Sequence, residues 1–253
     1  VSYSSLDYVG HAFGPRSWEV QDILVRLDKD LADLFAHLDK KVGRGNYIVA
    51  LSADHGVAPV PEDMEKTGAD VGVLHLAELQ ERMEKALEPF HLAKPATAHI
   101  NGSEVYFAPD VYEKLRHDDK AMRAVIDAAL TQPGVAEVFR AEQVKNRPAT
   151  QSPTRSAIAD SYFPGRSGDL FIVPKPYWLM DRSAPGKRRY GAGHGVSYNY
   201  DQHVPVLFMG FGIRHGEYFD AITPADIAPT LASLCGITLA TRDGHILSQA
   251  LGK

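Results

Sequence analysis

Apolar residues recur at steps of three and four between Val20 and Val42, and this stripe is the strongest constraint that the sequence places on its fold. The residues of the stripe are Val20, Ile23, Leu27, Leu31, Leu34, Leu38 and Val42. Such spacing lines one face of an α-helix, so we predict a helix over residues 18–42. Ser17 can cap its start and Gly43 can end it.

Strand-like sequences flank this helix on both sides. Residues 1–6 alternate between polar and apolar as a short strand does, and "NYIVALSA", residues 46–53, has the composition of a buried strand. Strand, helix and strand in this order are typical of a βαβ unit, in which helices cover the faces of a parallel sheet. We therefore predict an α/β fold with a mostly parallel central sheet between helices.

Shorter elements follow residue 61. They are an amphipathic helix at 76–88, a strand at 104–108, a helix at 120–130, a strand at 135–140 and then a proline-rich stretch. A core-like pattern returns with the strand "VPVLFMG" and the helix "PADIAPTLASLCG". We predict that residues 1–61 and 190–253 form the α/β core, and that residues 62–189 form an inserted α+β cap region.

Charge and hydropathy exclude several classes of protein. The net charge of -5 disfavours a nucleic-acid-binding surface, which normally carries a basic excess. No stretch approaches the roughly 18 consecutive apolar residues of a membrane-spanning helix, so we expect no membrane partner. The single cysteine, Cys235, rules out an internal disulfide, and its helical spacing predicts a buried thiol.

Three short motifs place Asp or His beside glycine at expected strand ends or in loops. They hold Asp7 and His11 in "DYVGH", Asp54 and His55 in "SADHG", and His194 in "GAGHG". Ligands bind in loops outside the carboxyl ends of strands in α/β sheets, and glycine allows a close approach. Mixed carboxylate and imidazole ligands suit zinc. Taken singly, each motif would also fit a turn with ordinary polar residues.

In their order along the chain, these motifs resemble those of the alkaline phosphatase superfamily. The segments that carry the resemblance are "SLDYVGHAFGP", "SADHG", "GRSGDLFIVPKPYW", "GAGHG", "YDQHVPVLFMG" and "DIAPTLASLCGI". The opening motif and the helix after it look most like the bacterial PafA-type alkaline phosphatases, which stand close to the type I phosphodiesterase/nucleotide pyrophosphatase group. The resemblance implies an alkaline-phosphatase-like α/β fold.

The resemblance also implies two zinc ions. Asp7, His11 and His194 match the three protein ligands of the first zinc, and Asp54 and His55 match two ligands of the second. In this family another Asp of the second site and the nucleophilic Thr or Ser lie further upstream. We therefore expect no nucleophile in this chain, and we expect an N-terminal part of the same protein as its partner.

The implied function is zinc-dependent hydrolysis of small phosphate monoesters through a phospho-Thr or phospho-Ser intermediate, in the periplasm or outside the cell. A type I phosphodiesterase or nucleotide pyrophosphatase with the same metals is the alternative enzyme. A further alternative, from another class, is an inactive fragment or pseudoenzyme that binds a metal or a partner.

Two more residues are candidates for hydrogen-bond support of the site. His203 precedes an expected core strand, and Asp169 lies in the family-like segment "RSGDL". For His203 we favour packing at the strand entry, and for Asp169 a role in the turn. The basic run Lys187, Arg188 and Arg189 could contact phosphate, although a solvated loop is the simpler interpretation.

Overall fold

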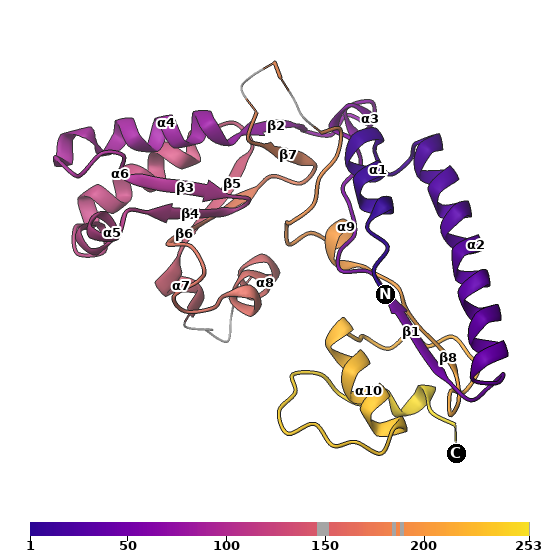
Figure 1. Cartoon of the computed structure of the whole chain (residues 1–253). Coiled ribbons are helices and arrows are strands. Elements are labelled where there is room, and N and C mark those ends of the chain that lie inside the picture. Colours follow the sequence, from indigo (N-terminus) through magenta and orange to yellow (C-terminus); the bar gives the residue numbers. More distant parts are fainter. Residues whose placement is uncertain (146–151, 184–185, 188–189, 253) are drawn as a thin grey trace. The chain divides into compact units, whose positions relative to one another are not determined.

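The computed structural model describes residues 1–145, 152–183, 186–187 and 190–252 (Figure 1). The chain divides into two compact units. The first unit comprises Val1–Gln21 and Val57–Gln202, and the second comprises Asp22–Gly56 and His203–Lys253. The predicted division into a core and a cap at residues 62–189 stays a prediction.

A four-stranded antiparallel sheet organises the first unit. Its strand order is β3-β4-β6-β5, with bounds β3 (Thr97–Asn101), β4 (Glu104–Phe107), β5 (Val135–Arg140) and β6 (Leu170–Pro174). All five residues of β6 are buried, as expected for the apolar run "LFIVP" in a central strand. The predicted strands at 104–108 and 135–140 are therefore confirmed.

Two amphipathic helices, α4 (Leu76–Leu87) and α6 (Asp119–Leu130), lie along one face of this sheet (Figure 1). Their apolar faces include the fully buried Leu79 and Val125. The Asp118 carboxylate caps α6 by accepting hydrogen bonds from the backbone N–H groups of Lys120 and Ala121, both at 3.0 Å. Shorter helices complete this part: α5 (Pro109–Leu115), α7 (Ala141–Lys145) and α8 (Pro153–Ser161).

The opening motif forms a helix, α1 (Ser5–Phe13), and not the strand predicted for residues 1–6. The backbone N–H of Tyr8 donates to the Ser4 carbonyl, and α1 ends at Gly14, whose φ of 86° suits glycine. Six alternating residues are too few to separate a strand from a helix turn. In the helix, Asp7 and His11 stand four residues apart and so share one face.

Parallel pairing is seen between β2 (Gly72–His75) and β7 (Trp178–Asp181), also in the first unit. The other named strands that the structure describes pair antiparallel, including β1 (Ile48–Ser52) with β8 (Val206–Gly210). The expectation of a mostly parallel sheet is therefore wrong for the described part of this chain. It rested on a βαβ unit whose first strand is in fact the helix α1.

In the second unit the antiparallel pair β1–β8 aligns Ile48 with Gly210 and Ser52 with Val206. The helix α2 (Trp18–Lys41), which begins in the first unit, confirms the helix predicted over 18–42. At its start, the Ser17 hydroxyl accepts a hydrogen bond of 3.2 Å from the Val20 N–H.

The chain after β8 is organised by one buried carboxylate. Asp226 accepts hydrogen bonds of 2.7 Å from the backbone N–H groups of both Thr223 and His245. This fixes the entry of the helix α10 (Ile227–Leu234), which follows the short 3-10 helix η2 (Pro224–Asp226). Cys235, directly after α10, is exposed, so the predicted buried thiol is wrong.

The short elements α3 (Pro61–Glu65), η1 (Glu88–Phe90), α9 (Asn199–Gln202) and η3 (Ser248–Ala250) complete the secondary structure of the described residues. Among these residues no helix combines the length and the apolar character needed to cross a membrane.

Candidate metal centre

The end of α1 is joined to the loop that carries His194. The backbone N–H groups of Gly191 and Ala192 donate to the His11 carbonyl, at 2.8 and 3.3 Å. In return, Nδ1 of His11 lies 2.9 Å from the Ala192 carbonyl oxygen. These contacts bring residues that lie 181 positions apart in the sequence into one place within the first unit.

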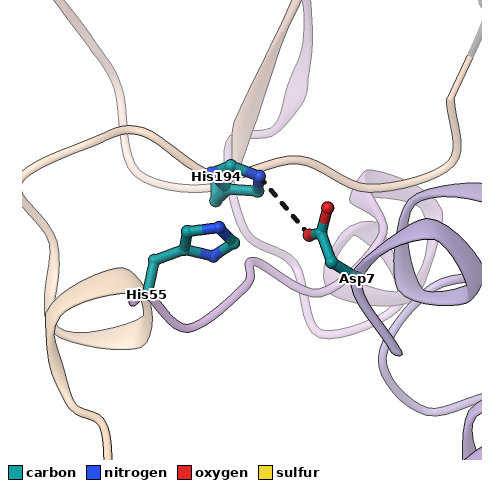
Figure 2. Close-up of side chains that lie close together, drawn as sticks. All are labelled: Asp7, His55 and His194. Atoms are coloured by element: carbon teal, nitrogen blue, oxygen red, sulfur yellow. Dashed lines mark ion pairs between the residues drawn. The ribbon is translucent and has the colours of Figure 1, made fainter. Parts of the chain in front are cut away.

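Three of the predicted zinc ligands meet there. The Oδ1 atom of Asp7 lies 3.5 Å from Nε2 of His11 and 3.5 Å from Nε2 of His194. The two Nε2 atoms lie 3.1 Å apart. Figure 2 shows the Asp7 carboxylate and the His194 ring facing each other; His55, also drawn, belongs to the second unit.

This triangle fits a tetrahedral metal ion. Bonds of about 2.0–2.1 Å at tetrahedral angles separate neighbouring ligand atoms by about 3.3–3.4 Å. The three observed separations of 3.1, 3.5 and 3.5 Å bracket that value. Two ring nitrogens 3.1 Å apart also need a proton or a cation between them, because their lone pairs otherwise repel. The donor set of one carboxylate and two imidazoles suits zinc.

Hydrogen bonding fixes which nitrogen of His11 can bind a metal. Its Nδ1 faces the Ala192 carbonyl oxygen, which accepts a hydrogen bond but cannot donate one. The proton of the neutral ring is therefore on Nδ1, and Nε2 presents its lone pair toward Asp7 and His194. Metal-binding histidines commonly use a backbone carbonyl in this way to hold the ring and set its tautomer.

Two glycines allow the His194 loop to take its path. A Cβ on Gly193 would lie 2.8 Å from Cδ1 of Leu179, so any larger residue would displace that side chain. Gly195 has a φ of 101°, a conformation that other residues rarely adopt. The Ala58 N–H donates to the Gly193 carbonyl at 3.2 Å and holds the loop from its other side.

The second unit contains the other predicted pair, directly after β1. Nε2 of His55 lies 3.5 Å from Oδ2 of Asp54, whose side chain is 88% exposed. Nδ1 of His55 lies 2.9 Å from the Gly56 carbonyl oxygen, so by the same argument the proton of the neutral ring is on Nδ1 and Nε2 carries the lone pair that can bind a metal. Asp54 and His55 therefore present two metal-type donors on one short turn.

Of the two candidates for supporting residues, one belongs to each unit. Asp169 lies before β6, where its carboxylate accepts a 2.9 Å hydrogen bond from the Phe107 N–H. Burial raises the pKa of the Asp169 carboxyl, the Phe107 hydrogen bond opposes this, and Glu142 adds to it. His203 is exposed and belongs to the second unit. Of the basic run, Lys187 is exposed, and Arg188 and Arg189 lie outside the described residues.

Two residues near His194 were not predicted. Tyr190 places its ring centroid 5.0 Å from that of His11. Asp201, only 4% exposed, accepts a 2.9 Å hydrogen bond from the Val196 N–H. The sequence carried no signal for Asp201, because the Val196 N–H lies five residues before it, outside the usual local side-chain-to-backbone patterns.

Known proteins are similar to this chain along its whole length. The profile of the family described as "Type I phosphodiesterase / nucleotide pyrophosphatase" matches residues 1–197. The alkaline phosphatase PafA of Elizabethkingia meningoseptica is 39% identical over 256 residues, covering 100% of this chain and 45% of that protein. Alkaline phosphatase PhoV of Synechococcus elongatus is 35% identical, covering 94% of this chain and 42% of that protein.

A crystal structure of wild-type PafA matches the fold with a TM-score of 0.84 and 36% identity, over 98% of this chain and 46% of that one. The expected alkaline-phosphatase-like α/β fold is thereby confirmed. The chain spans a little under half the length of these relatives.

Proposed function

This chain belongs to the type I phosphodiesterase / nucleotide pyrophosphatase family, and on that basis we propose that it supplies most of the metal centre of a zinc-dependent alkaline phosphatase. The observation that carries the proposal is the triangle of Asp7 Oδ1, His11 Nε2 and His194 Nε2, with edges of 3.1 to 3.5 Å. Identities of 39% and 35% to two alkaline phosphatases favour monoester hydrolysis over other reactions of the family.

Asp7, His11 and His194 would hold the first zinc ion, and Asp54 and His55 would supply two ligands of the second. A pair of zinc ions would lower the pKa of a hydroxyl nucleophile, balance the charge of the phosphoryl oxygens and stabilise the leaving oxygen. The chain's own contribution is to fix the ligands before substrate arrives. The Ala192 carbonyl holds His11, and the Gly56 carbonyl holds His55. Such preorganisation avoids reorganisation during the reaction.

We propose that the nucleophile, a Thr or Ser, and the remaining Asp of the second site come from an N-terminal part of the same protein. Two features support a further part. The chain covers 45% of PafA, and β8 exposes apolar side chains on alternate residues, with Leu207 58% exposed and Met209 41% exposed. A solvated strand face normally carries polar residues, and a two-stranded sheet alone is marginally stable. The additional part would cover this face.

Hydrolysis of phosphodiesters or nucleotide pyrophosphates by the same centre is the second candidate, because the matching family profile carries that name. One assay separates the two. The complete gene product, purified with zinc, is tested on a phosphate monoester and on a diester with the same leaving group. Faster monoester hydrolysis that stops with a zinc chelator and returns with zinc is the expected result. The reverse preference would establish the diesterase.

A matched pair of variants ties the activity to this centre. Replacing His194 with Ala should abolish monoester hydrolysis, whereas replacing the exposed His99, which stacks on Tyr106 at 4.4 Å, should leave it unchanged. A complete protein that binds zinc but hydrolyses neither ester would favour the pseudoenzyme.

The resemblance to this family also underlies our proposal that the enzyme acts in the periplasm or outside the cell. Cell fractionation with an antibody to this chain tests it. Recovery of the protein in the cytoplasmic fraction would refute the proposal.

A further inference from the structure

Asp201 lies at the junction between the His194 loop and the short helix α9. Its side chain is only 4% exposed, and its Oδ2 accepts a 2.9 Å hydrogen bond from the backbone N–H of Val196, two residues after His194. A buried carboxylate in such a position is costly unless it is hydrogen-bonded, so the bond to Val196 is a strong constraint on the loop. The flexible Gly195 stands between the constrained residue and His194.

The helix α9 is itself held from the far side by two tyrosines. The hydroxyl of Tyr198 donates to the Pro174 carbonyl at 2.8 Å. The hydroxyl of Tyr200 accepts a 3.1 Å hydrogen bond from the Tyr177 N–H, and the two rings stack with centroids 5.1 Å apart. Tyr177 occupies the left-handed region with a φ of 64°, which a tyrosine rarely adopts without support.

A continuous set of contacts therefore runs from the β6–β7 turn through α9 and Asp201 to Val196. On the other side of His194, the Gly193 carbonyl is held by the Ala58 N–H. The loop is thus fixed on both sides of the histidine, and Asp201 is the polar side chain that fixes the C-terminal side.

We propose that Asp201 is a positioning residue for the first metal site. By holding the Val196 N–H, it keeps Nε2 of His194 at the distance from Asp7 and His11 that one metal ion requires. The inference rests on the proposed metal centre, and it goes beyond it by assigning a determinant of metal affinity outside the ligand set. Loss of such supporting hydrogen bonds typically weakens metal binding about 10–100-fold.

The test measures zinc affinity by competition with a chromophoric chelator. The measurements use the His55→Ala background, so that only the first site is titrated. Asp201→Ala should raise the zinc Kd about tenfold or more. Asp201→Asn, which keeps one acceptor oxygen for Val196, should stay within about threefold of the parent and so rescue the site. Asp201→Leu, of similar volume but with no acceptor, should behave like the Ala variant and serves if the latter does not fold.

Asp226→Ala is the matched control. Asp226 is 5% exposed and also accepts two backbone hydrogen bonds, but from Thr223 and His245 in the second unit. The Asp226→Ala variant should have a lower midpoint temperature of unfolding and an unchanged zinc Kd.

The outcomes separate the two proposals. A parent chain that binds no zinc would refute the metal centre itself. A parent that binds zinc while Asp201→Ala or Asp201→Leu binds equally well would overturn only the role of Asp201. A loss of affinity shared by Asp226→Ala would likewise overturn it, because general destabilisation would then explain the effect.

Discussion

Nε2 of His11 and Nε2 of His194 lie 3.1 Å apart, although 183 positions separate the two histidines in the sequence. Their approach follows from backbone pairing, since the His11 carbonyl accepts from the N–H groups of Gly191 and Ala192. Because the Nδ1 proton of His11 points at the Ala192 carbonyl, the two rings meet through atoms that can share a proton or a metal ion.

Removing one ligand should weaken zinc binding far more than removing an unrelated histidine. In this chain, His194→Ala should raise the zinc Kd by about 100-fold, because one of three protein donors is lost. His99→Ala, on an exposed edge of β3, should leave the Kd unchanged. Chelator competition measures both. Equal affinities in the two variants would mean that His194 binds no metal.

Asp169 should support the fold of the first unit and not the metal. Asp169→Ala leaves the Phe107 N–H without its acceptor, which should cost about 1–3 kcal/mol of unfolding free energy, while zinc affinity is unchanged. A tenfold weaker zinc affinity in a folded Ala variant would instead show that Asp169 supports a ligand.

The same carboxyl gives a pH signature. Burial raises the pKa of the Asp169 carboxyl in the folded chain above its unfolded value of about 3.9, so the folded state binds this proton more tightly than the unfolded state does. The resulting stabilisation is complete below about pH 3.9 and is lost as pH rises through the folded pKa. Asp169→Asn should therefore be at least as stable as the parent at pH 7, and its advantage should shrink toward pH 4. Denaturant unfolding at the two pH values measures this. A larger advantage at pH 4 would contradict the assigned sign.

Asp226 should give the opposite dependence. The N–H groups of Thr223 and His245 lower the folded pKa of its carboxyl, so it stabilises the fold above about pH 3.9 and loses this effect as pH falls through the folded pKa. Asp226→Asn should cost about 1 kcal/mol at pH 7, and less at acid pH. Urea unfolding of Asp226→Asn and the parent at pH 7 and at acid pH measures this difference in stability. A larger loss of stability at acid pH than at pH 7 would refute the assigned direction of the pKa.

The exposed face of β8 should be an internal surface of the complete protein. Leu207→Glu should change the stability of this chain alone by less than about 0.5 kcal/mol, because the side chain is 58% exposed. In the complete gene product the same change should cost several kcal/mol, because it would bury an unpaired charge. Denaturant unfolding measures the cost of Leu207→Glu in both proteins, and the chain alone serves as the control. Equal costs in the two proteins would mean that this face stays in solvent.

Helices and strands with a strong local pattern could be predicted from the sequence, whereas the pairing of strands distant in sequence could not. The stripe from Val20 to Val42 predicted α2, and the apolar run before Asp54 predicted β1, because both patterns are set by which face is buried. The strand expected over residues 1–6 is the helix α1, and the described strands pair mostly antiparallel, with β2 and β7 as the parallel pair among them. Six residues carry too little periodicity, and strand direction depends on partners distant in sequence.

The proposed metal ligands of the first unit could be named from the sequence, whereas the residue proposed to position one of them could not. Asp7, His11 and His194 stand in short motifs whose residue types already suggest metal chemistry. Asp201 is proposed to act through its hydrogen bond to Val196, and only the folded loop shows which N–H its carboxylate reaches. Asp169 stands in a family-like segment, yet its carboxylate serves the Phe107 N–H.

Anomalous diffraction at the zinc absorption edge, from crystals of the zinc-loaded protein, tests the central claim most directly. We expect a peak about 2.0–2.1 Å from Nε2 of both His11 and His194 and about 2.0–2.2 Å from a carboxylate oxygen of Asp7. Absence of a peak between these three side chains in protein that carries zinc elsewhere would contradict it.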